Sequence, residues 1–295
     1  MNISYDSYRV FYYAAKYRSF TQAAKLLGGS QPNVTRSMKL LEAALGCQLF
    51  ARSRQGVRLT PEGETLYGHI ALAFAHIQAG ENEIASMQGM QSGVVTVAAS
   101  GIALRCCLLP VLKDYRSKYP GVRVRVSNHA TPQAIAVLQD GLADLAVVTM
   151  PLHLPKSLRR RKLMEIQEVP VAGTAFTALA GRMLTLADLA DCPLVGLGPQ
   201  SAAFAFYSQI FSSQGLPYHP DIETATSDQI LPMVRSNLGV GFVPESFAKD
   251  GVLSGTLLPL ALQTPIPKRA VCLVQQEHQP LSAAARELEA MLKAF

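Results

Sequence analysis

SFTQAAKLLGGSQPNVTRSMKLLE, residues 19–42, is the stretch that decides the fold. Two short helix-like segments are separated in it by Gly-Gly-Ser-Gln-Pro. Ser19 and Gln22 have the spacing of an S-x-x-Q capping box, in which the hydroxyl and the amide satisfy free backbone groups at a helix start. The spacing therefore predicts a short helix over residues 21–27.

A sharp corner follows this helix. Gly28 and Gly29 can adopt the positive φ that ends a helix, and Ser30 is expected to cap the next helix through its side chain. Pro32 fits the first turn of that helix, where its missing N–H does no harm. Two helices joined by so short a connection predict a helix–turn–helix.

The second helix of this pair has one apolar face. Val34, Met38 and Leu41 lie on the same side at helical spacing, and polar side chains occupy most of the other positions. A helix fits the major groove of DNA, where Gln or Asn pairs with adenine and Arg with guanine. The predicted DNA-contacting residues are Ser30, Gln31, Pro32, Asn33, Thr35, Arg36 and Lys39. An ordinary solvated face in an αα-hairpin is the alternative interpretation.

Residues 49–60, LFARSRQGVRLT, have the pattern of a small β-hairpin, or wing. Arg52, Arg54 and Arg58 belong to this hairpin. From there they are expected to reach phosphates or a neighbouring minor groove.

The positive charge of the chain is concentrated in the same region. The whole chain carries a formal net charge of +6. Residues 1–60 hold nine Lys and Arg against Asp6 and Glu42, a net charge of +7, whereas the other 235 residues hold eighteen basic and nineteen acidic side chains. A basic head on a nearly neutral body predicts a polyanion, double-stranded DNA, as partner.

The rest of the composition indicates a folded protein of about two domains. The 295 residues are 49% hydrophobic, which is enough to build cores. No secretory signal pattern and no apolar run of about 18–20 residues occurs, so we expect a cytoplasmic protein without a membrane partner. The five cysteines lack a CxxC pair or metal-ligand spacing, so we expect reduced thiols, no metal site and no cofactor.

The N-terminal region resembles the winged helix–turn–helix of LysR-type transcriptional regulators. The resemblance implies a DNA-binding regulator and not an enzyme. The family usually has Ser at the position of Thr35 and often Arg at that of Gln55, where Arg54 can stand in. The residues that carry the resemblance are Phe11, Ser19, Phe20, Thr21, Ala23, Ala24, Leu27, Ser30, Gln31, Pro32, Leu41, Glu42, Leu45, Gly46, Leu49, Phe50, Arg52, Leu59, Thr60 and Gly63.

A long helix with an apolar seam follows the wing, from Pro61 to about Met90. Its apolar residues recur three, four, three and seven positions apart, at Tyr67, Ile70, Phe74, Ile77 and Ile84. The seam can pack against its own chain. The resemblance instead implies a linker helix that pairs antiparallel with a second copy in a homodimer, and a homotetramer is also possible. A dimer would present two heads to two half-sites. We expect a DNA-binding domain at 1–60 and the linker at 61–92.

Residues 93–295 alternate predicted strands and helices, which favours a largely parallel α/β sheet. A second set begins near Val169, and AVCLVQQ with the final helix returns to the first. The arrangement resembles the two-lobed type 2 periplasmic-binding-protein fold, which the family uses as its effector domain. The lobes are expected at 93–163 with 268–295, and at 164–267. The fold class is therefore α+β multidomain.

The residues just after each strand are candidates for a ligand site, because open α/β sheets bind ligands beyond the carboxyl ends of their strands. Hydroxyls and free N–H groups at helix N-termini form a ready site for an anion, so a small organic acid is the predicted effector. The candidates are Ser100, Gly101, Ile102, Thr131, Thr149, Ser201 and Thr226, the last paired with Gln229 in a second capping box. The alternative is that each hydroxyl only caps its own helix.

Two loops of this predicted site depart from the family pattern. Similar family members often have Ser-Asp-Thr at residues 100–102 and two Thr at 130–131, where this chain has Ser-Gly-Ile and Ala-Thr. The loss of polar groups favours a less polar or a different ligand. His129, beside the second loop, is interpreted as a surface residue.

Two other classes of protein fit parts of the sequence. The C-terminal two-thirds have the architecture of a solute-binding receptor, but the basic head argues against that class. An enzyme acting on a small acid would need catalytic groups, and no G-x-S-x-G, phosphate loop, H-E-x-x-H or paired-carboxylate motif occurs. The basic run at residues 159–162 is interpreted as a solvated charge cluster, with a contact to anions or another subunit as the alternative.

Overall fold

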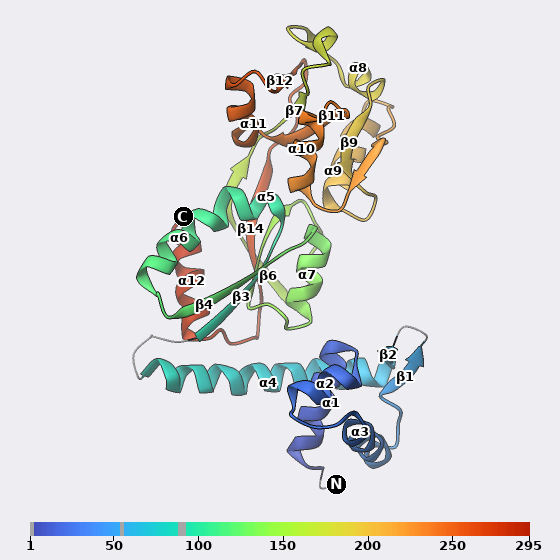
Figure 1. Ribbon diagram of the computed structural model, residues 1–295, viewed down its shortest axis with the longest axis vertical. Coiled ribbons are helices and arrows are strands. Elements are labelled where there is room, and N and C mark those ends of the chain that lie inside the picture. The colour runs from blue at the N-terminus through green and yellow to red at the C-terminus, as the bar shows by residue number, and fades with distance from the viewer. Residues whose placement is uncertain (1–2, 54–55, 88–92) are drawn as a thin grey trace. The chain divides into compact units, whose positions relative to one another are not determined.

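The computed structural model describes residues 3–53, 56–87 and 93–295. The chain divides into two compact units, Met1–Glu81 and Asn82–Phe295. A winged helix–turn–helix is followed by a long helix and a two-lobed α/β domain (Figure 1). Within the described ranges no helix is both long enough and apolar enough to span a membrane. The five cysteines are free thiols.

Three helices form the core of the N-terminal unit. They are α1 (Tyr5–Tyr17), α2 (Phe20–Leu26) and α3 (Gln31–Leu45). Each contributes its apolar face to one cluster, in which Phe11, Met38 and Leu41 are almost fully buried. The predicted helix–turn–helix is therefore confirmed.

The ends of α2 are fixed by the local signals in the sequence. Ser19 Oγ accepts the backbone N–H of Gln22 at 3.2 Å, which is the hydroxyl half of the predicted capping box. At the other end Gly28 has a φ of +66°, and the Gly29 N–H donates to the Ala24 carbonyl at 2.9 Å. This is a Schellman ending, and it turns the chain directly into α3.

Ser30 occupies the N-cap position of α3, but its side chain makes no capping hydrogen bond. The prediction that its hydroxyl caps the helix is therefore wrong. An N-cap side chain binds the N–H of the second or third helical residue, and Pro32, at the second position, has none. The Ser30 hydroxyl is left on the exposed surface at the start of the helix.

The predicted wing is present as two short strands. β1 (Phe50–Ser53) pairs antiparallel with β2 (Gly56–Leu59), with Phe50 opposite Leu59. Because the pairing continues to Ser53 opposite Gly56, the strands form a tight hairpin.

A carboxylate ties the wing to α3. Glu42 Oε1 accepts the backbone N–H groups of Leu49 at 2.8 Å and of Phe50 at 3.1 Å, so the first strand starts at a fixed place beside the helix. Gly63 lies against the Leu49 carbonyl oxygen, and a Cβ at this position would come within 2.1 Å of it. Only glycine therefore lets the next helix begin so close to the wing.

The apolar seam of the long helix α4 (Pro61–Met87) divides into two parts. Tyr67 and Ile70 pack against the N-terminal core, and Phe74 stacks on Tyr12 with ring centroids 4.5 Å apart. Ile77 and Ile84, further along, are 41% and 65% exposed. The chain itself uses the first part of the seam and leaves the second part uncovered.

The first lobe of the α/β domain is built on a five-stranded sheet of order β4-β3-β5-β14-β6. Its strands are β3 (Gly93–Ala99), β4 (Val122–Asn128), β5 (Leu145–Met150), β6 (Leu158–Ile166) and β14 (Arg269–Gln276). β3 runs parallel to β4 and β5, whereas β14 runs antiparallel to β5 and β6. The sheet is thus mixed instead of largely parallel, because β14 returns from the second lobe in the opposite direction.

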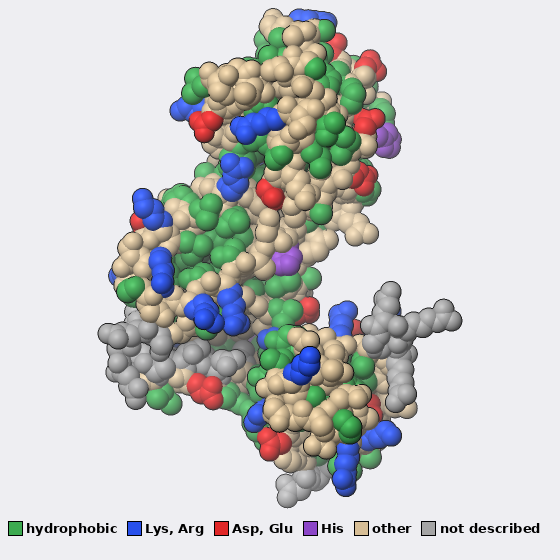
Figure 2. Space-filling view, in the orientation of Figure 1, with side chains coloured by type: hydrophobic (Ala, Val, Ile, Leu, Met, Phe, Trp, Pro, Cys, Tyr) green, Lys and Arg blue, Asp and Glu red, His purple; other side chains and the backbone are tan. Residues whose placement is uncertain are grey.

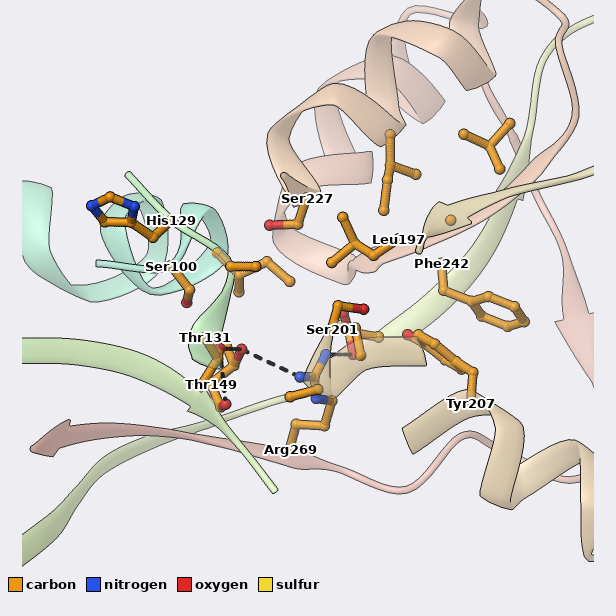
Figure 3. A pocket seen from close by; sticks show the side chains of 18 of the residues that line it. Ser100, His129, Thr131, Thr149, Leu197, Ser201, Tyr207, Ser227, Phe242 and Arg269 are labelled. Carbon is orange, nitrogen blue, oxygen red and sulfur yellow. Dashed lines mark hydrogen bonds and ion pairs between the residues drawn. The ribbon is translucent and has the colours of Figure 1, made fainter. Parts of the chain in front are cut away.

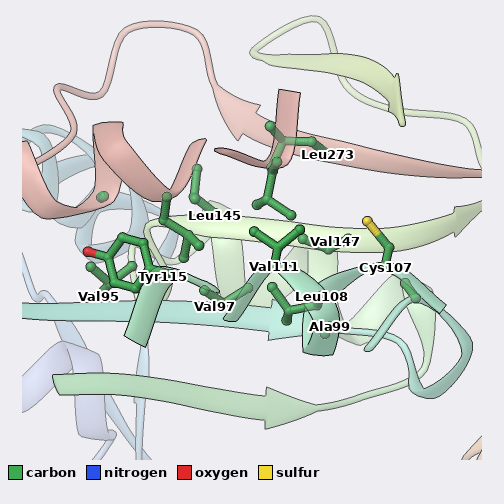
Figure 4. Close-up of a cluster of buried hydrophobic side chains, with 14 of the residues drawn as sticks. Val95, Val97, Ala99, Cys107, Leu108, Val111, Tyr115, Leu145, Val147 and Leu273 are labelled. Carbon is green, nitrogen blue, oxygen red and sulfur yellow. The ribbon is translucent and has the colours of Figure 1, made fainter. Parts of the chain in front are cut away.

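Helices cover both faces of this sheet. They are α5 (Gly101–Ala103), the π-helical turn η1 (Leu104–Leu108), α6 (Leu109–Lys118), α7 (Thr131–Gln139) and α12 (Ala283–Ala294). On the face of α6 and α12, the cluster in Figure 4 surrounds Tyr115, whose hydroxyl donates to the Ala284 carbonyl at 2.9 Å. α7 covers the other face.

The second lobe has its own five-stranded sheet of order β10-β9-β11-β7-β12. Its strands are β7 (Glu168–Ala172), β9 (Leu194–Leu197), β10 (Ile222–Thr224), β11 (Val240–Pro244) and β12 (Leu258–Pro259), and β8 (Met183–Leu184) pairs separately with β13 (Ala261–Leu262). Its helices are η2 (Thr177–Leu179), α8 (Leu186–Ala190), α9 (Ala202–Ser212), η3 (Ser227–Gln229), α10 (Ile230–Arg235) and α11 (Glu245–Leu253). The chain crosses between the lobes from β6 to β7 and again before β14, which brings Glu168 and Arg269 to the crossing.

Candidate DNA-binding surface and effector pocket

The outer face of α3 carries exposed polar side chains, as predicted. Gln31, Asn33, Arg36 and Lys39 are exposed, whereas Val34, Met38 and Leu41 point into the core. Pro32 is exposed at the start of the same helix. The helix therefore presents hydrogen-bonding and cationic groups to its surroundings from a rigidly packed base.

Thr35 is positioned differently from its neighbours on this helix. Its hydroxyl donates to the Gln31 carbonyl one turn earlier, at 3.0 Å, and the residue is only partly exposed. The Thr35 hydroxyl oxygen can still accept a hydrogen bond, but the hydroxyl proton is already donated to the Gln31 carbonyl.

The basic side chains of this unit are mostly free to meet an anion. Among the residues that the structure describes, Arg36, Lys39 and Arg58 enter no ion pair, and Figure 2 shows Lys and Arg side chains on the surface of this unit. The backbone of Arg52 pairs with Val57 in the wing. The Arg52 side chain and the whole of Arg54 lie outside what is described.

A pocket lies between the two lobes of the α/β domain, beyond the ends of their strands. The empty space in the pocket and in front of its mouth, open solvent included, is about 540 Å³. Its lining residues are Ser100, Ile102, His129, Ala130, Thr131, Thr149, Glu168, Val195, Gly196, Leu197, Ser201, Ala202, Ala203, Tyr207, Tyr218, Ser227, Ile230, Phe242 and Arg269. Five of the seven residues predicted for an effector site therefore converge on one pocket, although they come from four separate segments of the chain.

The hydroxyl groups of the pocket fall into two kinds. Ser100 Oγ accepts from the Ala103 N–H at 3.4 Å, and Ser201 Oγ accepts from the Phe204 N–H at 3.0 Å, so both cap their own helices. A hydroxyl that accepts in this way keeps its proton to donate to a ligand. Thr131 caps nothing; its Oγ1 lies 3.3 Å from Thr149 Oγ1 instead.

Two predicted residues lie beside the pocket without lining it, namely Gly101 and Thr226. The predicted capping box of Thr226 and Gln229 is also wrong, because Thr226 makes no side-chain capping bond and the Gln229 side chain accepts from the Ala225 N–H at 3.2 Å. Its neighbour Ser227 reaches the pocket instead. His129, expected on the surface, also lines the pocket, on the same side as Ser100 (Figure 3).

A buried ion pair forms the polar side of the pocket, and no pattern in the sequence predicts it. Arg269 Nη1 lies 3.0 Å from Glu168 Oε2, and both side chains are about 98% buried. The same guanidinium donates from Nε to the Met150 carbonyl at 3.2 Å and from Nη2 to Thr149 Oγ1 at 3.3 Å (Figure 3). The pair ties β14 to β7 and to the end of β5.

The second lobe contributes aromatic side chains that sequence reasoning also missed. Tyr207 stacks on Phe242 with ring centroids 4.5 Å apart, and Tyr218 packs beside them. Burial, together with the nearby Glu168 carboxylate, raises the pKa of Tyr207 well above its ordinary value. The neutral Tyr207 hydroxyl is buried beside Glu168 and Arg269 in the pocket wall, and it has no hydrogen bond of normal geometry to the described residues.

A winged helix–turn–helix joined to a two-lobed α/β domain with a pocket between its lobes defines the class of ligand-responsive DNA-binding proteins. The comparisons identify the family. A family model described as "LysR substrate binding domain" matches residues 88–295, and one described as "Bacterial regulatory helix-turn-helix protein, lysR family" matches residues 5–64. The chain belongs to the LysR family of transcriptional regulators, and it is a DNA-binding regulator and not an enzyme.

Similar proteins extend over most of the chain. The HTH-type transcriptional regulator IlvR of Caulobacter vibrioides is 29% identical and covers 82% of each chain. The transcriptional activator protein LysR of Escherichia coli is 25% identical over 94% of this chain and 88% of its own. The structure of full-length OxyR from Pseudomonas aeruginosa has a TM-score of 0.74 at 21% identity, covering 100% of this chain and 95% of that one, which shows a shared fold.

The Glu168–Arg269 pair gives a test of the pocket's architecture. Arg269→Met removes the cation and leaves Glu168 as a buried, unpaired carboxylate, so we expect the free energy of unfolding to fall by about 3–5 kcal/mol. Adding Glu168→Gln to that variant should recover much of the loss. Urea denaturation of the full chain, followed by circular dichroism, measures both effects.

Arg159→Met is the matched control, because Arg159 lies 3.7 Å from Glu289 with 58% of its side chain exposed. Glu289 is largely buried but also pairs with Lys293, and Arg159 is mostly exposed, so losing Arg159 should cost at most about 1 kcal/mol. If Arg269→Met costs no more than Arg159→Met, the buried pair does not hold the lobes as described.

Proposed function

We propose that α3 reads base edges in the major groove and that the wing contacts the DNA backbone. The observation that carries the proposal is the exposed outer face of α3, where Arg36 and Lys39 enter no ion pair among the described residues. Such side chains match the donors and acceptors of base edges and the charge of phosphates. The proposed contacts are Ser30, Gln31, Pro32, Asn33, Thr35, Arg36, Lys39, Arg52, Arg54 and Arg58. Because its partner is chromosomal DNA, we infer that the protein acts in the cytoplasm.

Arg36→Ala tests the base contact. We expect it to weaken specific DNA binding by about 1–3 kcal/mol and to relax the preference at one base position. The measurement is fluorescence anisotropy against a duplex selected from a random library and against single-base variants of it. Arg9→Ala is the control, because Arg9 has the same charge but is paired with Asp6 on α1. An equal loss on every sequence would instead make Arg36 a phosphate contact.

We propose that the pocket binds a small organic acid with an apolar body. Arg269 is the guanidinium of the lining, and Glu168 already neutralises it, so the acid would be held mainly by hydroxyl donors. Ser100, Ser201 and Tyr207 offer such donors. The opposite wall is apolar, formed by Val195, Leu197, Ile230 and Phe242. This combination suits one carboxylate on a largely hydrocarbon molecule better than a dicarboxylate.

The effector proposal is tested with a panel of small carboxylic acids and the full-length protein. We expect at least one apolar monocarboxylate to raise the melting temperature, and Tyr207→Phe to weaken its binding about tenfold, because one hydrogen bond is lost. Tyr115→Phe is the control, since it removes a buried hydroxyl that does not line the pocket and should lower stability without changing ligand affinity. Binding of dicarboxylates alone, or equal affinity in Tyr207→Phe, would contradict the proposal.

Regulation follows if the acid binds one arrangement of the lobes better than another. A ligand shifts an equilibrium only by its differential affinity for the two states. The coupling to DNA binding is then a free energy shared between two sites, so DNA should change the affinity for the acid by the same factor.

We propose that residues 61–92 are the linker between a DNA-binding domain at 1–60 and an effector domain at 93–295, and that α4, which ends at Met87, is the dimerisation helix of this linker; residues 88–92 lie outside the described part of the chain. The uncovered part of the α4 seam, Ile77 and Ile84, supports this assignment. An exposed apolar stripe on a helix is stabilised by a second such stripe. The antiparallel pairing of two copies of α4 would cover it.

Ile84→Glu tests the proposed dimer. We expect the dissociation constant of the dimer, measured by analytical ultracentrifugation, to rise at least about tenfold, because a charge would be buried in the interface. Leu72→Glu is the matched control, since Leu72 is an exposed leucine on the same helix but off the seam. Identical dissociation constants for both variants would show that the seam is not the interface.

A further inference from the structure

One hydrogen bond joins the two lobes directly beside the pocket. Asn128 Nδ2 donates to Asp228 Oδ1 at 3.0 Å. Asn128 ends β4 in the first lobe, and Asp228 lies in η3 of the second. Their chain neighbours His129 and Ser227 both line the pocket, one from each lobe (Figure 3).

Gly101 lets the lobes approach at the same place. A Cβ at this position would lie 2.9 Å from Asp228 Oδ1 and 3.0 Å from Ser227 Oγ. Both atoms are ends of side chains, so a larger residue could be accommodated if they moved. The Asp228 carboxylate would then leave the position in which Asn128 holds it.

A second contact lies beside the first. The Arg105 guanidinium, in the π-helical turn η1, lies 4.0 Å from the centre of the Phe247 ring on α11. Burial alone would raise the pKa of Asp228, but hydrogen bonds from Thr226 and Asn128 and the charge of Arg105 outweigh it, so its pKa lies below the ordinary value. The carboxylate therefore stays charged at neutral pH and remains an acceptor for Asn128.

We propose that Gly101, Asn128 and Asp228 form a clasp that closes the lobes over the mouth of the effector pocket and must open for a ligand to enter. The inference rests on the proposed effector function of that pocket. Asn128 and Asp228 are exposed, so water can replace their hydrogen bond, and the clasp can open without unfolding either lobe. The three residues are positioning residues that set how often the pocket is accessible.

The proposal is tested by hydrogen exchange on the full-length protein without DNA or effector. Asn128→Asp places two carboxylates where a hydrogen bond now stands. We expect amides of residues 101–108 and 227–235 to exchange about five to ten times faster, because the two segments lose each other's protection. The swapped variant, Asn128→Asp with Asp228→Asn, restores a donor opposite an acceptor and should return exchange to within about twofold of the original.

Gly101→Ala is an independent test, since it displaces Asp228 without adding a charge. It should speed amide hydrogen exchange in the same two segments. Amides of β5, in the core of the first lobe, serve as the internal control. Unchanged exchange in Asn128→Asp, no rescue by the swap, or equal acceleration in β5 would each overturn the clasp. These exchange rates are measured without DNA or effector, so a failure of DNA or effector binding would not change them. The clasp and the proposed effector function can therefore fail separately.

Discussion

The α/β domain depends on how one buried guanidinium is satisfied. A charge removed from water is stable only when it is paired and hydrogen-bonded, and Arg269 meets this requirement with groups from two other strands, β5 and β7. Glu168 supplies the opposite charge, while Thr149 and the Met150 carbonyl take two of the remaining N–H groups. Phe206 of α9 lies against the guanidinium at 5.1 Å. Since these partners belong to both lobes, the interaction fixes the crossing around which the pocket is built.

This neutral pair also decides what the pocket can recognise. A free guanidinium would attract any small anion, whereas the Glu168–Arg269 pair presents a dipole with little net charge. In the function that we propose, recognition then falls to weaker donors, the hydroxyls of Ser100, Ser201 and Tyr207, and to the apolar wall of the second lobe. Each such hydrogen bond contributes about 1 kcal/mol, so shape and apolar contact must supply much of the selectivity.

The sequence predicts the helix–turn–helix well because its signals are local. Ser19, Gly28 and the spacing of Val34, Met38 and Leu41 each act within a few residues of the chain. The pocket hydroxyls could be predicted for a related reason: they follow strands, and strand ends meet at one edge of a sheet. Arg269 and Glu168 could not, because they are 101 residues apart and nothing nearby in the sequence reveals that they are buried together. The mixed sheet was missed for the same reason, since the direction of β14 depends on a long return through the second lobe.

The contacts on the two sides of the pocket differ in kind, and this difference sets how the lobes can move. Separating Glu168 from Arg269 would leave each of these buried charges without its partner, which is unfavourable. The crossing between the lobes therefore resists opening. Asn128 and Asp228 are already in contact with solvent, so their separation costs only a hydrogen bond that water can replace. The lobes are joined by a buried ion pair on one side, and by an exposed hydrogen bond and the Arg105–Phe247 contact on the other, so they open on the second side, as a hinge. A ligand that fits only the closed pocket therefore shifts the lobes about the Arg269 crossing, with little change inside either lobe.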